Sequence, residues 1–207
     1  MRLDIPFLEK DDQFVLYTDI DVMFLQSPSL DHLSPPILAA GPEFERNTEK
    51  MKYFNAGVLL MNIPAMQGIC AQILNDINNG IRNRTNLYDQ GYLNDYCYSS
   101  LTKLPLQLNW KPYWGYSDKA EIVHFHGMKP SGDMQSSGFA MSEGGYINCF
   151  SDNLTDVSGY VYYLLKFYEF LGQTDSNWIR KNLEDIFRIR YGKNRRLRAL
   201  LENLLRG

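Results

Sequence analysis

The stretch LYTDIDVMF, residues 16–24, places two carboxylates inside a run of strand-forming apolar residues. Only Ile20 separates Asp19 from Asp21. Residues two apart in an extended segment point to the same face, so both carboxylates can converge on one cation. Buried acids are costly unless a positive partner meets them. The spacing therefore indicates a site for a divalent cation, and its alternative is a surface turn after a strand.

The composition is that of a globular protein. The chain has 207 residues, 44% hydrophobic and 22% charged, which suits one domain or one domain with a tail. Its longest apolar run, AGVLLM, is too short to span a membrane, and the charged start MRLDIPFLEKDD is not typical of a signal peptide. Cys70, Cys97 and Cys149 are odd in number and widely spaced, which favours reduced thiols. We expect a cytoplasmic protein.

Strand and helix patterns alternate along the chain. Apolar runs bounded by turn residues predict strands over 35–43, 53–62, 101–110 and 120–127, and residues 14–24 read as a strand running into a metal-type loop. Helical spacing predicts a helix over about 64–79, and residues 88–98 are expected to form a shorter helix. A further helix follows, with one apolar face made of Val157, Tyr160, Val161, Leu164, Leu165 and Tyr168. The sequence therefore predicts an α/β fold with a mixed sheet flanked by helices.

A second polar motif is IVHFHGMKP, residues 122–130. His124 and His126 alternate along the predicted strand and so share a face. Gly127 lets backbone approach a ligand closely, and Lys129 supplies a point charge suited to phosphate. A histidine joining two carboxylates favours Mn²⁺ over Mg²⁺. The alternative is a hydrogen-bonded core histidine.

Side-chain amides form the third group. Asn55 heads the strand over 53–62, and Gln90 lies near the start of the helix over 88–98. Amides both donate and accept, as sugar hydroxyls require. The alternative is capping or turn chemistry, as when Asp89 caps the helix it opens. Trp110 and Trp114 are either sugar-stacking surfaces or core residues.

Together these motifs resemble a known family. LYTDIDVMF, YFNAGVLLMN, DQGYLN, LPLQLNW and HFHGMKP occur in the order seen in glycosyltransferase family 8, the family of glycogenin and the lipopolysaccharide galactosyltransferases. The resemblance covers roughly residues 2–130. It implies a GT-A fold, a UDP-sugar donor, Mn²⁺ with Mg²⁺ as the alternative, and hexose transfer with retention of configuration. The implied acceptor is a saccharide or a lipid-linked saccharide.

The resemblance also implies roles for single residues. Asp19, Asp21 and His124 match the metal ligands, with Asp19 also at the donor, and Gly127 and Lys129 match the turn that binds the diphosphate. Asp89 and Gln90 match the catalytic set, with Gln90 at the reacting face. The remaining donor-binding matches are Arg2, Asn55 and Ala56. One departure is that Met128 alone separates Gly127 from Lys129, where the family usually has two residues.

The family begins with about two strand–helix units before the metal motif, roughly 60–90 residues. We therefore expect residues 1–150 to form a GT-A-like catalytic portion without the nucleotide-binding units, and 151–207 a helical region. A non-catalytic remnant or sugar-nucleotide-binding module is the first alternative. A haloacid-dehalogenase-type phosphatase is the second, although it expects Thr or Val where Met23 stands.

The C-terminal end is basic. From Trp178 onward the chain has nine Lys or Arg against three Asp or Glu. In residues 193–207, leucines fall on one helical face and cations gather at its N-terminal end. This pattern indicates either a helix docked on the domain or an interfacial helix at the inner face of an anionic membrane. The acidic remainder argues against nucleic acid as a partner.

Overall fold

The computed structural model describes residues 2–85, 87–126, 156 and 158–172. Gly127, Lys129, Cys149 and the basic segment 193–207 lie outside the described residues, and so does Val157. By their internal contacts the described residues form two compact units. The first contains the chain up to Ile20 together with Gln26–Asn109, and the second contains Asp21–Leu25 and the described residues from Trp110 onward.

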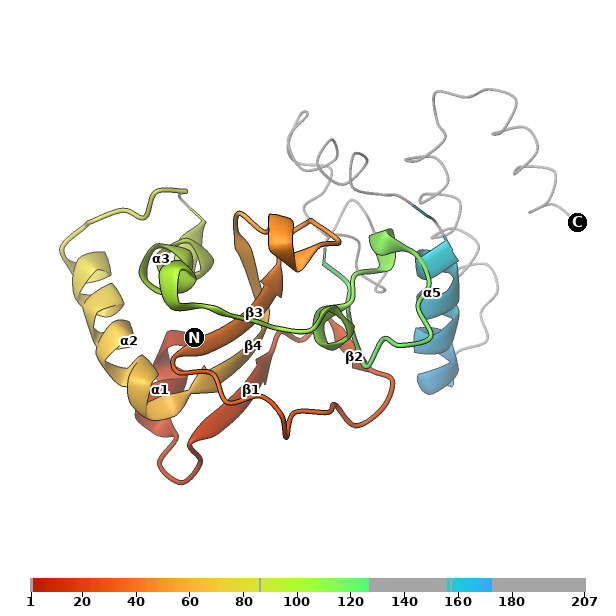
Figure 1. Ribbon diagram of the computed structural model, residues 1–207, viewed down its shortest axis with the longest axis horizontal. Helices are drawn as coiled ribbons and strands as arrows, with labels where there is room; N and C mark the ends of the chain where they lie inside the picture. The colour runs from red at the N-terminus through yellow and green to blue at the C-terminus, as the bar shows by residue number, and fades with distance from the viewer. Residues whose placement is uncertain (1, 86, 127–155, 157, 173–207) are drawn as a thin grey trace, which may run out of the picture. The chain divides into compact units, whose positions relative to one another are not determined.

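A mixed sheet of four strands lies at the centre of the first unit (Figure 1). Its order is β1 (Phe14–Thr18), β4 (Phe54–Asn62), β3 (Leu38–Pro42) and β5 (Thr102–Lys103). β4 pairs antiparallel with both β1 and β3, whereas β5 pairs parallel with β3. Every residue of β4 except Asn62 is buried, as the continuous apolar run in its sequence predicts.

Three helices accompany this sheet. They are α1 (Ile5–Leu8), α2 (Ile63–Asn78) and α3 (Tyr88–Cys97), drawn together at one side of the sheet in Figure 1. α2 contains a proline in its first turn, where the missing N–H costs nothing. Apolar side chains from helices and sheet form one core: Leu3, Leu38, Ala40, Met51, Phe54, Ala56, Leu59, Met61, Ile63, Met66, Cys70, Ile73, Leu93 and Cys97. Cys70 and Cys97 are free thiols, as expected.

The second unit contains a two-stranded ribbon and a helix. β2 (Val22–Phe24) pairs antiparallel with β6 (Ile122–His124), which sets Val22 opposite His124. α5 (Ser158–Phe170) packs on the short 3-10 helix η5 (Pro112–Trp114). Trp110 and Trp114 are 5% and 1% exposed and meet edge to face, so they are core residues.

Two of the expected strands are shorter in the structure. Of residues 101–110 only Thr102–Lys103 is strand, and Leu106–Asn109 forms the 3-10 helix η4. Pro105 lacks an N–H, and its carbonyl accepts from Leu108 to close the helical turn. β6 ends at His124, where the His126 N–H turns back to the His124 carbonyl at 2.7 Å. His126 therefore lies outside the strand on which a shared face with His124 was expected, and the centroids of the two rings lie 5.5 Å apart.

The apolar face expected for α5 was partly wrong. Leu165 is 46% exposed, whereas Tyr163 is buried. The Tyr163 hydroxyl donates to the Ser117 carbonyl and accepts from the Ser117 N–H, both at 3.0 Å. These two hydrogen bonds satisfy the polar hydroxyl of the buried side chain.

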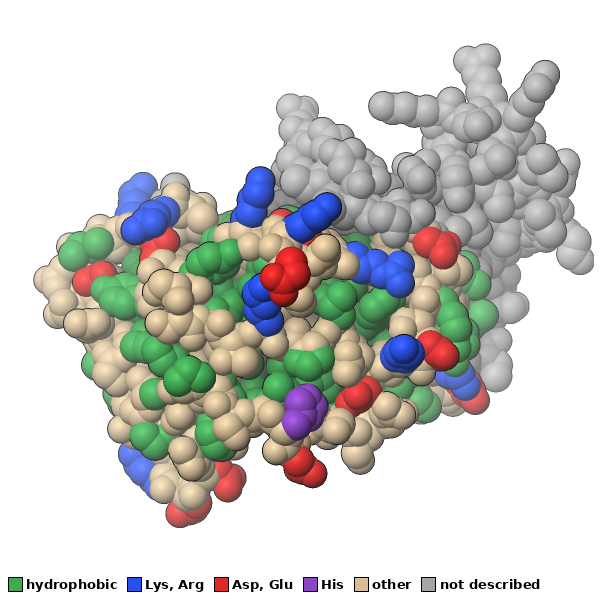
Figure 2. All heavy atoms as spheres, viewed as in Figure 1, with side chains coloured by type: hydrophobic (Ala, Val, Ile, Leu, Met, Phe, Trp, Pro, Cys, Tyr) green, Lys and Arg blue, Asp and Glu red, His purple; other side chains and the backbone are tan. Residues whose placement is uncertain are grey.

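The described surface is mixed in character. Acidic and basic side chains are interspersed among polar and apolar ones on the face drawn in Figure 2. Among the described residues, none of the helices combines the length and the hydrophobicity that crossing a membrane requires.

Candidate functional site

The two aspartates of the opening motif lie on either side of a strand break. Asp19 follows β1, and its N–H donates to the Gly57 carbonyl at 2.8 Å. Asp21 precedes β2, and its carbonyl accepts from the Phe125 N–H at 2.9 Å. Ile20, the only residue between them, is fully exposed. Because one residue links them, the chain itself keeps the two carboxylates close together.

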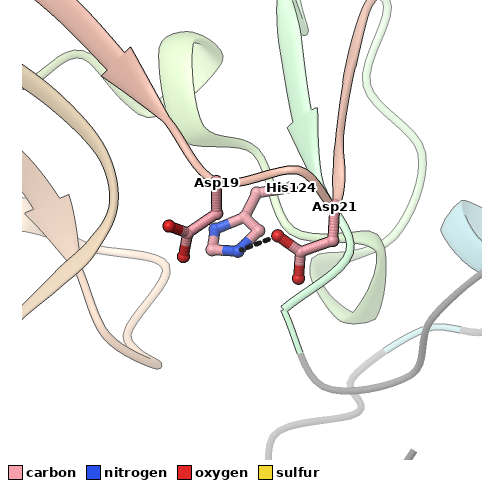
Figure 3. A group of neighbouring side chains, drawn as sticks. All are labelled: Asp19, Asp21 and His124. Carbon is pink, nitrogen blue, oxygen red and sulfur yellow. Dashed lines mark ion pairs between the residues drawn. The ribbon is translucent and has the colours of Figure 1, made fainter. Parts of the chain in front are cut away.

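His124 completes a group of three ligands with the aspartates. Its Nε2 lies 3.5 Å from Asp21 Oδ1, and Figure 3 shows its ring between the carboxylates of Asp19 and Asp21. One ligand atom from each of the three lies within 4.8 Å of the others. Two carboxylates and an imidazole are donors that fit a divalent cation such as Mn²⁺, so these residues can hold a metal ion.

Burial controls the protonation of His124. Its side chain is 2% exposed, and this burial lowers the imidazole pKa to about 4, although hydrogen bonding to Asp21 opposes the shift. The ring is therefore neutral at pH 7. A neutral imidazole offers a lone pair to a metal, whereas a protonated one does not.

Arg2 joins several of the predicted site residues. Its Nη2 lies 3.0 Å from Asp19 Oδ1, and its Nε lies 3.0 Å from Asp89 Oδ2. Its Nη1 donates to the Ala56 carbonyl at 2.5 Å, and its guanidinium lies over the Tyr17 ring. Each of the three guanidinium nitrogens of Arg2 thus has a partner within the protein.

Tyr17 adds a second donor to Asp19. Its hydroxyl donates to Asp19 Oδ1 at 2.5 Å. Burial is the larger cause and the hydrogen bond to Asp19 the smaller one that together raise the pKa of Tyr17 to about 12. The hydroxyl therefore stays protonated at neutral pH. One oxygen of Asp19 therefore accepts from both Tyr17 and Arg2.

The two predicted amides meet at one carboxylate. Gln90 Nε2 donates to Glu43 Oε2 at 3.1 Å, and Asn55 Nδ2 donates to the same oxygen at 3.0 Å. Gln90 Oε1 accepts from the Ala56 N–H at 2.8 Å. Asn55 Oδ1 accepts from the Gly57 N–H and from Asn109 Nδ2.

The peptide groups of Ala56 connect the arginine and amide clusters. Gln90 binds its N–H, and Arg2 binds its carbonyl. The structure thus joins, in one hydrogen-bonded network, Arg2, Asp19, Asn55, Ala56, Asp89 and Gln90. Their roles in binding and catalysis stay predictions, and Gly127 and Lys129 lie outside the described residues.

Three members of this network were missed from the sequence. Tyr17 precedes Asp19 by two residues, so the period of a strand could have indicated that they share a face. Glu43 directly follows the end of β3, which is a weak signal. Asn109 carried no signal, since its segment was expected to be a strand.

Comparisons with known proteins place this fold. No family model matches the chain, and no curated protein matches it. The glycosyltransferase GlyE of Streptococcus pneumoniae TIGR4 matches with 21% identity and a TM-score of 0.52, over 73% of this chain and 45% of GlyE. An active-site mutant of LgtC matches with 18% identity and a TM-score of 0.50, over 87% of this chain and 69% of LgtC.

The chain thus spans less than half the length of the GlyE chain. At these identities the likeness establishes the fold alone. The expected fold is confirmed: a mixed sheet flanked by helices, in the architecture of GT-A type glycosyltransferases and covering it in part.

Proposed function

We propose that this chain carries the metal- and donor-binding site of a glycosyltransferase that moves a hexose from a UDP-sugar to a saccharide or lipid-linked saccharide acceptor, with retention of configuration. The observation that carries the proposal is the convergence of Asp19, Asp21 and His124. The GT-A type fold supports it, and so does the order of the motifs that resemble family 8.

The ion proposed for the three ligands is Mn²⁺, with Mg²⁺ as the alternative. A neutral imidazole beside two carboxylates favours the ion that accepts nitrogen more readily. When bound, such an ion acts as a Lewis acid toward the diphosphate of the donor. Lys129, which lies outside the described residues, is proposed as a second positive group for that diphosphate.

The amide network is proposed to bind the donor sugar, with Gln90 at the reacting face. Glycosidase-type retention needs a carboxylate oxygen free to attack the anomeric carbon. Glu43 Oε2 already accepts two amide hydrogen bonds, which makes that oxygen a poor nucleophile. We therefore propose front-face attack by the acceptor. Arg2 is proposed to organise Asp19 and Asp89 at the donor.

We further propose that the protein works in the cytoplasm, at the inner face of the membrane if the basic segment 193–207 binds anionic lipid. A sugar-nucleotide-binding module without turnover is the alternative that the experiments below separate.

The first experiment titrates Mn²⁺ into the protein by calorimetry. Wild type is expected to bind one ion, and Asp21→Asn and His124→Ala to weaken binding by about 10-fold or more, since each removes a ligand. Asp12→Asn removes an exposed acid that is not one of the three candidate ligands and should leave the affinity unchanged. Equal affinity in all four proteins would contradict the metal site.

The second experiment adds UDP-hexoses with Mn²⁺ and measures binding and release of UDP. Release that requires Mn²⁺ and disappears in Asp21→Asn supports the transferase. Binding without release supports the module. Absence of both contradicts a UDP-sugar site in this chain.

A further inference from the structure

We infer that Glu43 is a positioning residue: its carboxylate fixes the amide groups of Asn55 and Gln90, and so decides which polar atoms this network presents to a ligand. The positioning role rests on contacts alone. The identity of the ligand, a donor sugar, rests on the proposed function.

The backbone of Glu43 is held firmly in place. Pro42, the last residue of β3, pairs with Phe54, the first residue of β4. The Glu43 N–H then donates to the Tyr53 carbonyl at 3.0 Å. The Glu43 side chain therefore starts beside the beginning of β4, where Asn55 lies two residues further on.

The contacts leave one orientation for each amide. A carboxylate oxygen accepts hydrogen bonds, so both amides must turn an NH₂ group toward Glu43. At the other end, Gln90 Oε1 meets the Ala56 N–H, which can only donate. Turning Gln90 over would set oxygen against oxygen and N–H against N–H. Asn55 is fixed in the same way, because its Oδ1 accepts from the Gly57 N–H.

This arrangement assigns what remains for a ligand. Each NH₂ group has two N–H bonds, and one from each amide donates a hydrogen bond to Glu43. The second proton of Gln90 Nε2 and the second lone pair of its Oε1 then have fixed directions. Sugar hydroxyls both donate and accept, so a fixed donor beside a fixed acceptor can read the direction of a hydroxyl group.

The charge of Glu43 matters as well as its shape. Hydrogen bonds to an ionised acceptor are about twice as strong as neutral ones. Glu43→Gln keeps the shape and one acceptor oxygen but removes the charge, whereas Glu43→Ala removes both. Glu43→Ala is therefore expected to loosen the two amide groups most, and Glu43→Gln to loosen them less.

The first test needs no activity. In ¹⁵N-labelled protein, the side-chain NH₂ signals of Asn55 and Gln90 are followed by hydrogen exchange. Exchange of both is expected to accelerate by about 10-fold or more in Glu43→Ala and less in Glu43→Gln, because the shared acceptor is lost. Glu49→Ala, a glutamate paired with Lys103, is the matched control and should change neither signal. Unchanged exchange in Glu43→Ala overturns the inference.

A charge exchange tests the direct contact. Gln90→Glu replaces the amide that lies 3.1 Å from the Glu43 carboxylate with a second carboxylate. Two like charges this close destabilise each other. Gln90→Glu should therefore speed hydrogen exchange of the Asn55 NH₂ group. Adding Glu43→Gln should largely restore the slow exchange, because one carboxylate again faces one amide. Effects of the two substitutions that simply add would contradict the contact.

The last test concerns the ligand. If wild type releases UDP from a UDP-hexose, Glu43→Gln should lower kcat more than it raises KM, as expected for a group that orients Gln90. Equal changes in both would reduce Glu43 to a binding contact and overturn this part of the inference. If wild type releases no UDP, the proposed transfer reaction fails, whereas the exchange measurements still decide the positioning role.

Discussion

At the scale of single residues, Asp19 shows how its neighbours can set the direction of a ligand. Its Oδ1 accepts from Tyr17 and from Arg2. Two donors on one oxygen hold the carboxylate in one orientation and favour Oδ2 for a cation. Removing such a supporting contact commonly lowers metal affinity by about 10–100-fold.

Removing one of these donors is expected to weaken metal binding. Tyr17→Phe keeps the ring beneath Arg2 but removes the hydroxyl that orients Asp19. The affinity for Mn²⁺, measured by calorimetry, should fall by about 10-fold. Tyr53→Phe is the control, because its hydroxyl contacts Thr85 instead. An unchanged affinity in Tyr17→Phe would show that Arg2 alone orients the carboxylate.

Tyr88 carries backbone strain one residue before Asp89. Its φ is +38°, and among the described residues no other non-glycine has a positive φ. Asn tolerates this region, so Tyr88→Asn is expected to raise the free energy of unfolding by about 0.5–1 kcal/mol. Urea denaturation measures the change. Tyr88→Ala keeps the backbone strain. An equal gain in its free energy of unfolding would show that the effect comes from loss of the aromatic ring, which is 88% exposed.

At the scale of elements, the sequence predicted β3, β4, α2 and α3 closely. β3 and β4 are continuous apolar runs, and α2 has apolar residues at helical spacing with a proline in its first turn. The segment over 101–110 failed because Pro105 removes a donor and the next turn closes as a 3-10 helix. Local sequence patterns predict a helix or strand correctly where no proline interrupts its hydrogen bonds.

The candidate site was predictable to the extent that its residues share local spacing. The DxD spacing and the strand histidine indicated the metal ligands. Glu43 could not be found in this way, because its two partners lie 12 and 47 residues away in sequence. Arg2 entered through the resemblance alone, and its contacts with Asp19 and Asp89 required the structure.

Two helix glycines should respond oppositely to alanine. A Cβ on Gly159 of α5 would lie 2.2 Å from the Pro112 carbonyl oxygen and 2.5 Å from that of Gly115, which are backbone atoms that cannot turn aside. A Cβ on Gly68 of α2 would meet nothing within 4 Å. Gly68→Ala should add about 0.5–1 kcal/mol of stability through helix propensity.

Gly159→Ala should cost stability by about 1–3 kcal/mol, as overpacking does. Thermal unfolding of both variants beside wild type measures the two changes. A stable Gly159→Ala protein would show that α5 does not pack on η5 as described.

At the scale of the whole molecule, two buried thiols report on how often the core opens. Cys70 lies on α2 and Cys97 on α3, and neither is exposed. Burial raises the pKa of Cys70 to about 11 and that of Cys97 to about 12. The thiolate is the reactive form, so both should resist alkylation in the folded protein.

In a Cys149→Ser background, iodoacetamide at pH 8 is therefore expected to label neither thiol within the time that it labels the urea-unfolded chain completely. The sign with pH follows from the raised pKa values. The unfolded chain loses thiol protons near pH 9 while the folded chain keeps them, so stability should fall as the pH rises above that value. Rapid labelling without denaturant would contradict a closed core.

Ile20 has a practical use for measurement. Its side chain is fully exposed although its neighbours on both sides are the candidate metal ligands Asp19 and Asp21. In the Cys149→Ser background, Ile20→Cys would place a fluorescent dye beside the two carboxylates, while the interior thiols stay unlabelled. Mn²⁺ is paramagnetic and quenches a nearby dye, whereas Mg²⁺ is diamagnetic and does not. One labelled molecule would thus report, by its loss of brightness, how far Mn²⁺ fills the site, and recovery of brightness on adding Mg²⁺ would report its displacement.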